Sequence, residues 1–105
     1  MNILFICSKN KWRSKTAEEI YKNGSHHQVI SAGTEPSAKV RASAKHIVWA
    51  DIIFAMEKPH KQRFAENFPE EIKDKKVVVL DIPDEYEYMD RELVDMIRLS
   101  VDPYL

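Results

Sequence analysis

Glycine and cysteine are scarce in this sequence, with two glycines and one cysteine among 105 residues. Glycine-rich nucleotide-binding loops need several glycines close together, so that class is excluded. A single cysteine cannot form an intramolecular disulfide, and it favours a reducing, cytoplasmic location. The longest apolar runs, residues 3–7, 52–56 and 77–80, are far too short to span a bilayer. The N-terminal residues lack the pattern of an export signal, so we expect a cytoplasmic protein without a membrane partner.

The composition predicts one globular domain over residues 1–105. Hydrophobic residues make up 44% and charged residues 31%, which argues against disorder, and a second core would not fit in this length. Charge is distributed unevenly. The first 50 residues carry eight Lys and Arg against three Asp and Glu, whereas the remainder carries eight against fourteen. The basic segment around Lys9 and Arg13 directly follows an apolar strand, which makes it the part to pursue.

Apolar runs and helical patterns alternate along the chain. Strands are predicted at residues 2–6, 28–31, 51–56 and 76–80. Helices are predicted at 14–23, 39–48 and 90–101, with another that begins at Pro59 and places Phe64 and Phe68 on one side; Gly24 serves as a helix stop. This order predicts an α/β fold, a three-layer α/β/α arrangement with a four-stranded parallel sheet. Ligands of such sheets bind beyond the carboxyl ends of the strands, and Cys7 stands at the end of the first one.

The segment from Cys7 to Ser14 joins the first strand to the first helix with the spacing C-x5-R-S. Such a connection turns several backbone N–H groups toward one point at the positive end of a helix, which makes an anion site. These N–H groups and the Arg13 guanidinium stabilise Cys7 as a thiolate, and Arg13 can also grip phosphate oxygens as a bidentate fork. Ser14 can donate its hydroxyl to the thiolate. The alternative is a buried structural cysteine followed by a solvated basic turn.

These residues resemble the signature of the low molecular weight protein tyrosine phosphatases. The similarity runs along most of the chain, through LFIC ending at Cys7, Asn10, Arg13 and Ser14, AE at residues 17–18, SAGT at 31–34 and DIIFAM at 51–56. The chain is also similar to a short bacterial branch described as predicted tyrosine phosphatases. The resemblance implies a phosphatase-like fold and a phosphoric monoester hydrolase.

A leaving phenoxide needs a proton donor, and the resemblance implies an aspartate in the loop after the fourth strand, commonly within Asp-Pro-Tyr. This chain has DPY only at residues 102–104, after its last helix, on a tail that would have to cross the domain to reach Cys7. Asp84 holds the family's position in the loop, so we expect it to be the acid, with Asp81 as second candidate and Asp102 as third. The alternative is that Asp81 and Asp84 only make turn hydrogen bonds around Pro83.

By this resemblance, Cys7 attacks phosphorus to form a phosphocysteine, which water then hydrolyses, with no cofactor or metal. Arg13 and the loop backbone hold the oxygens, while Asn10 and Ser14 keep the loop's shape, with Ser31 as a candidate further member. A phosphoprotein is the expected substrate, and phosphate or another oxyanion should bind in the loop. The expected catalytic residues are Cys7, Arg13 and Asp84, and the expected substrate-binding residues are Ser8, Lys9, Asn10, Lys11, Trp12 and Ser14.

Three departures from the family bear on the substrate. The chain is shorter between Thr34 and Asp51, where the family builds part of its substrate wall. Lys9 and Lys11 replace a glycine and an apolar residue. Trp12 replaces the family's second loop cysteine, which disfavours the arsenate reductases of this fold because they need additional thiols. A basic mouth with a tryptophan suits a phosphate flanked by further negative charge, on an acidic phosphopeptide or on a nucleotide or nucleic-acid end.

Other functions stay open beside a tyrosine phosphatase. A non-hydrolytic phosphate-binding or phosphocysteine carrier module needs the nucleophile and the anion site but neither Arg13 nor Asp84. A phosphatase acting on a nucleotide or nucleic-acid phosphate is another alternative, although the slightly acidic chain shows no nucleic-acid recognition motif. No pair of histidines has metal-ligand spacing, so surface or packing roles are expected for His26, His27, His46 and His60.

Overall fold

The four predicted strands form one parallel sheet in the computed structural model, which describes residues 1–23 and 26–105. The strands lie in the order β2-β1-β3-β4, where β1 is Asn2–Cys7, β2 is Gln28–Gly33, β3 is Ile52–Ala55 and β4 is Lys76–Val79. In the register of the sheet, Leu4 of β1 pairs with Ile30 on one side and Ile53 on the other. The predicted α/β class with a four-stranded parallel sheet is therefore confirmed.

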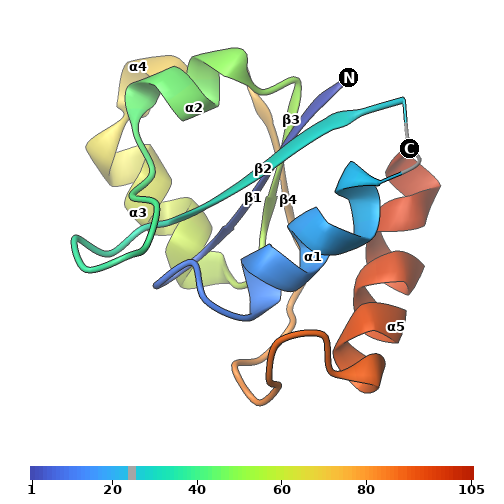
Figure 1. Cartoon of the computed structure of the whole chain (residues 1–105). Coiled ribbons are helices and arrows are strands. Elements are labelled where there is room, and N and C mark those ends of the chain that lie inside the picture. Colours follow the sequence, from blue (N-terminus) through green and yellow to red (C-terminus); the bar gives the residue numbers. More distant parts are fainter. Residues whose placement is uncertain (24–25) are drawn as a thin grey trace.

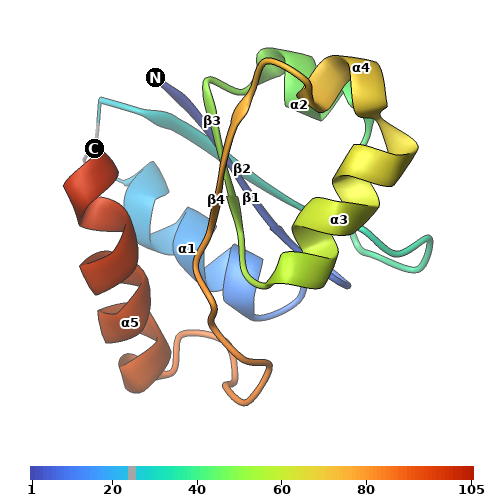
Figure 2. The same ribbon diagram turned by 180° about the vertical axis from the view of Figure 1, so that it is seen from behind.

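Helices cover both faces of this sheet, as Figures 1 and 2 show. On one face lie α1 (Arg13–Lys22) and α5 (Arg91–Val101), which contact each other. On the other lie α2 (Ala44–Trp49), α3 (Lys58–Asn67) and the short α4 (Pro69–Ile72), and a 3-10 turn η1 (Asp102–Tyr104) follows α5. None of the helices in the described part of the chain is long and apolar enough to cross a membrane.

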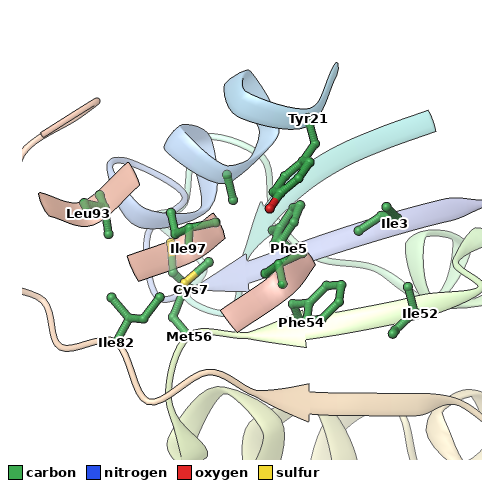
Figure 3. Close-up of a cluster of buried hydrophobic side chains, with 12 residues drawn as sticks. Ile3, Phe5, Cys7, Tyr21, Ile52, Phe54, Met56, Ile82, Leu93 and Ile97 are labelled. Carbon is green, nitrogen blue, oxygen red and sulfur yellow. The ribbon is translucent and has the colours of Figure 1, made fainter. Parts of the chain in front are cut away.

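The alternation of side chains along β1 divides the core into two layers. Ile3, Phe5 and Cys7 face α1 and α5, whereas Leu4 and Ile6 face α2 and α3. All five are at most 3% exposed, because a strand inside a parallel sheet is covered on both faces. Figure 3 shows the first of these layers, with the Cys7 sulfur near Ile97 and Met56. The packing fixes where β1 ends and therefore where Cys7 is held.

The helix predicted at residues 39–48 is wrong in its first half, since α2 begins only at Ala44. The preceding residues instead pair with the end of β2: Gly33 N donates to Val40 O and Ala42 N donates to Gly33 O, both at 2.8 Å. Ser43 then takes an extended backbone and caps α2. These backbone bonds to the sheet override a middling helical pattern. α4 was not predicted, and the stop predicted at Gly24 lies outside the described residues.

Candidate active site

The loop after β1 is held by hydrogen bonds from the segment that follows β2. Thr34 N donates to Cys7 O and Glu35 N donates to Ser8 O, both at 2.9 Å, and Lys39 N donates to Lys9 O at 3.2 Å. Gly33 allows this close approach: a Cβ built on it would lie 2.6 Å from Ser8 O and 2.9 Å from the backbone nitrogen of Asn10. Any larger residue at position 33 would push the loop away.

Inside the loop, a chain of hydrogen bonds starts at the thiol of Cys7. Cys7 Sγ lies 3.0 Å from Ser14 Oγ, and Ser14 Oγ donates to Asn10 Oδ1 at 2.9 Å. Asn10 has φ of 55°, a left-handed backbone that asparagine adopts more readily than most residues. Asn10 and Ser14 are fully buried, so their side chains support the shape of the loop.

Arg13, the first residue of α1, is 4% exposed and is fixed from two other elements. Its Nη1 donates to Glu57 Oε1 at 2.5 Å and to Ile82 O at 2.9 Å. Its Nε lies 3.7 Å from Asp84 Oδ1. A buried guanidinium needs such partners, because burying an unpaired charge is costly. Among the described residues, no hydrogen bond engages Nε or Nη2, so both donors can serve a ligand.

His60, near the start of α3, links the loop to the same helix end. Its Nδ1 accepts a hydrogen bond from Glu57 N at 3.1 Å, so the hydrogen of the neutral ring is on Nε2, which lies 2.9 Å from Ser8 Oγ. Burial, together with the nearby Arg13 charge, lowers the pKa of His60 to about 4. The ring is therefore a neutral donor to Ser8 at physiological pH, which leaves the hydroxyl hydrogen of Ser8 to point elsewhere.

A cavity of about 310 Å³ opens over the loop. It contains all three predicted catalytic residues and four predicted binding residues, since its lining consists of Cys7, Ser8, Lys9, Lys11, Trp12, Arg13, Glu35 and Asp84. The two remaining predicted binding residues are Asn10 and Ser14, buried below it. The arrangement brings a thiol, a guanidinium and an exposed carboxylate to one opening. No cluster of three or more His, Cys, Asp and Glu in residues 1–23 and 26–105 is arranged to hold a metal ion.

The three candidate acids lie in different places. Asp84 lines the cavity, whereas Asp81, with φ of 55°, is exposed and does not line it. Asp102 accepts a hydrogen bond of 2.5 Å from the hydroxyl of Tyr21, near the C-terminal end of α1. Figure 1 shows the C-terminus beside the amino ends of the strands, whereas the loop lies at their carboxyl ends. Asp102 therefore lies remote from Cys7.

Solved structures with the same architecture include phosphatases, at low sequence identity. The YwlE arginine phosphatase from Geobacillus stearothermophilus is 24% identical, with a TM-score of 0.76 over 98% of this chain and 92% of that one. A low molecular weight protein tyrosine phosphatase from T. tengcongensis is 21% identical, with a TM-score of 0.78 over 100% of this chain and 99% of that one. The fold is that of the low molecular weight protein tyrosine phosphatases. The tyrosine phosphatase Wzb from Escherichia coli K30, solved in complex with phosphate, is 19% identical, with a TM-score of 0.76 over 98% of this chain and 94% of that one. No protein-family model and no curated protein matches the sequence.

Within this phosphatase fold, three residues at the site were not predicted from the sequence. They are Glu57, which binds Arg13, His60, which contacts Ser8, and Glu35, which lines the cavity. The sequence does hold a signal for the two glutamates, because Glu35 and Glu57 each follow by two residues the end of a strand next to β1. The suggested role of Ser31 in the loop is wrong: its hydroxyl donates to Glu18 Oε1 at 2.8 Å on α1 instead.

Proposed function

We propose that the protein is a phosphomonoesterase that hydrolyses phosphotyrosine in proteins through a phosphocysteine on Cys7. The observation that carries this proposal is that Cys7, Arg13 and Asp84 line one cavity, with the Arg13 Nε 3.7 Å from the Asp84 carboxylate. The phosphatase fold supports it further. A carrier module would use the cysteine and the anion site but has no use for an exposed carboxylate facing the guanidinium.

In the first step, the Cys7 thiolate forms a bond to phosphorus and the bond from phosphorus to the tyrosine oxygen breaks. Asp84, in its protonated form, gives its proton to the departing phenolate. In the second step, water attacks phosphorus, the bond to sulfur breaks, and Asp84 takes a proton from that water. Phosphate leaves, and the thiolate and the acid are restored. Arg13 and the loop N–H groups stabilise the charge on the equatorial oxygens in both steps.

The hydroxyl of Ser14 has a part in the thiolate's chemistry. Ser14 has one hydrogen, which it donates to Asn10 Oδ1 while its oxygen faces Cys7 Sγ at 3.0 Å. When Cys7 loses its proton, the sulfur can no longer donate, and a rotation of the Ser14 hydroxyl supplies a hydrogen bond to it. A thiolate stabilised in this way is a better leaving group when the phosphocysteine is hydrolysed.

The test is hydrolysis of p-nitrophenyl phosphate and of a phosphotyrosine peptide in the presence of EDTA. We expect turnover to disappear in Cys7→Ser and to fall about 100- to 1,000-fold in Arg13→Ala. Asp84→Asn should slow the peptide reaction more than the p-nitrophenyl reaction, because tyrosine, with a pKa of about 10, is the poorer leaving group. Asp102→Asn is the matched control and should keep the wild-type rate.

Other outcomes would assign a different function. A folded wild type that turns over neither substrate, while phosphate still protects Cys7 from alkylation, would identify a binding or carrier module. Preference for a phosphoarginine peptide or a 5′-phosphorylated oligonucleotide over the phosphotyrosine peptide would keep the mechanism and overturn the substrate. A rate unaffected by Asp84→Asn but reduced by Asp81→Asn would reassign the acid.

A further inference from the structure

A second hollow, of about 480 Å³, lies directly beside the active-site cavity. Lys11 and Trp12 line both, so the two spaces adjoin at these residues. The floor is the exposed face of α1, and Lys39 and Tyr88 complete the rim. We call this hollow the α1 groove.

The charges of the α1 groove do not cancel. Its two carboxylates are already engaged, because Glu18 pairs with Lys15 at 3.4 Å and Glu19 pairs with Lys22 at 2.8 Å. Glu18 also accepts the hydrogen bond from Ser31. Lys11 and Lys39, by contrast, form no ion pair with any described residue. Two exposed cations are thus available next to the mouth of the catalytic cavity.

The walls of the groove are aromatic and are anchored to the fold. Trp12 is 47% exposed and Tyr88 49% exposed, large fractions for such side chains. The neighbour of Tyr88 is fixed to α1 by a hydrogen bond of 2.9 Å from Met89 N to Thr16 Oγ1. On the other side, the bond from Lys39 N to Lys9 O ties Lys39 to the phosphate loop. The backbone at each rim is therefore hydrogen-bonded to the loop or to the helix that follows it.

Resting on the proposed phosphatase function, we propose that the α1 groove is a subsite for acidic side chains next to the phosphorylated tyrosine, so that the substrate class is an acidic phosphopeptide. The tyrosine ring passes beside Trp12, and a neighbouring Asp or Glu pairs with Lys39 and Lys11. A nucleic acid fits less well, because a phosphate backbone needs a continuous cationic track. Here Glu18 and Glu19 interrupt the lysines, which suits one or two separate carboxylates.

The test compares two phosphotyrosine peptides of equal length, one with Glu and one with Gln at the positions flanking the phosphotyrosine, together with p-nitrophenyl phosphate. The variant is Lys39→Glu. The matched control is Lys73→Glu, an exposed lysine just after α4, and α4 lies on the opposite face of the sheet from α1 (Figure 1). The two peptides share the same tyrosine leaving group. The two variants have the same net charge and differ only in where the charge is changed.

For the wild type we expect a higher kcat/KM on the Glu peptide, through a lower KM, and a preference that shrinks as NaCl rises from 20 to 500 mM. Lys39→Glu should reduce the preference about 3- to 10-fold, the scale of an exposed ion pair replaced by repulsion. Lys73→Glu should leave the preference and the p-nitrophenyl phosphate rate unchanged. Lys39→Glu should change the ratio between the two peptides more than it changes p-nitrophenyl phosphate turnover.

Equal kcat/KM on the two peptides, or an equal effect of both lysine variants, would overturn the subsite. The subsite would also be overturned if the wild type preferred a 5′-phosphorylated oligonucleotide over the Glu peptide and Lys39→Glu removed that preference. If the protein proves inactive, binding of the same peptides to the Cys7→Ser variant, measured by tryptophan fluorescence, tests the subsite separately. Absence of p-nitrophenyl phosphate turnover refutes the proposed function, whereas a Glu preference in binding that Lys39→Glu removes supports the subsite on its own.

Discussion

Replacement of His60 by glutamine should change how the stability of the fold depends on pH. His60 is 4% exposed, and its pKa in the folded protein is about 4, below its ordinary value of 6.5. Between pH 6.5 and pH 4, His60 is protonated in the unfolded chain but neutral in the folded protein. The stability that the neutral His60 contributes is therefore fully present above pH 6.5 and is lost as the pH falls toward 4. A difference of roughly 2.5 units corresponds to about 3 kcal/mol over the whole window. About 1 kcal/mol of it is lost by pH 6 and about 2 kcal/mol by pH 5.

Glutamine cannot titrate, but it can still accept the hydrogen bond from Glu57 N at the start of α3. His60→Gln should therefore be less stable than the wild type by about 1 kcal/mol at pH 7.5, because the contact with Ser8 Oγ is lost. The two proteins should be equally stable near pH 6, and the variant should be the more stable one at pH 5. His46, whose pKa is also lowered by burial, contributes to both proteins alike.

The measurement is urea unfolding at half-unit steps from pH 4.5 to 7.5, followed by circular dichroism. His26→Gln is the control, because His26 is exposed, and its profile should run parallel to that of the wild type. Parallel profiles for His60→Gln and the wild type would refute the reasoning, since they would mean that His60 titrates alike in the folded and unfolded chain. A crossing shared by His26→Gln would refute it as well.

Two further substitutions test how the loop and the C-terminus are placed. Gly33→Ala should lower stability by about 1–3 kcal/mol, because the added Cβ would meet Ala38 and lie 2.6 Å from Ser8 O. It should also reduce p-nitrophenyl phosphate turnover at least tenfold. Unchanged thermal melting and unchanged turnover would contradict the close approach of Gly33 to the loop. Tyr21→Phe should cost about 1–2 kcal/mol in urea unfolding, because it removes the hydrogen bond to Asp102, while kcat stays at the wild-type value. A fall in kcat without a loss of stability would place Asp102 nearer the reaction than the structure does.

The sequence was most informative where a structure depends on neighbouring residues. Each of the four predicted strands is a strand in the sheet. The apolar runs of β1 and β3 are buried on both faces because these strands lie in the middle of the sheet, whereas the edge strands β2 and β4 are only partly buried. The loop from Cys7 to Arg13 could be recognised because its residues are consecutive and join a strand directly to a helix. Its position also depends on hydrogen bonds from residues 34–39. The segment at 39–43 depends on backbone bonds to Gly33 instead, and helical periodicity carries no information about such bonds.

The supports of Arg13 and Ser8 were missed because they are distant along the chain. Glu57 is 44 residues from Arg13, and His60 is 52 residues from Ser8. His60 is the third residue of α3, and its Nδ1 accepts the hydrogen bond from Glu57 N. Its second nitrogen gives it the additional contact with the loop, and only the juxtaposition of β1 and β3 brings Ser8 within reach.

The strand order explains how these supports converge. The sheet is parallel and β1 lies between β2 and β3, with β4 beyond β3. The segments that follow the other three strands therefore begin on the same side of the sheet as the loop after β1. Each contributes one carboxylate, Glu35 after β2, Glu57 after β3 and Asp84 after β4. A search for the first acidic residue after each strand would have found Glu35 and Glu57 but would have taken Asp81 instead of Asp84. The left-handed turn at Asp81 and the three residues that follow bring the exposed carboxylate of Asp84 to the cavity, and a turn of that kind is not encoded in the strand order.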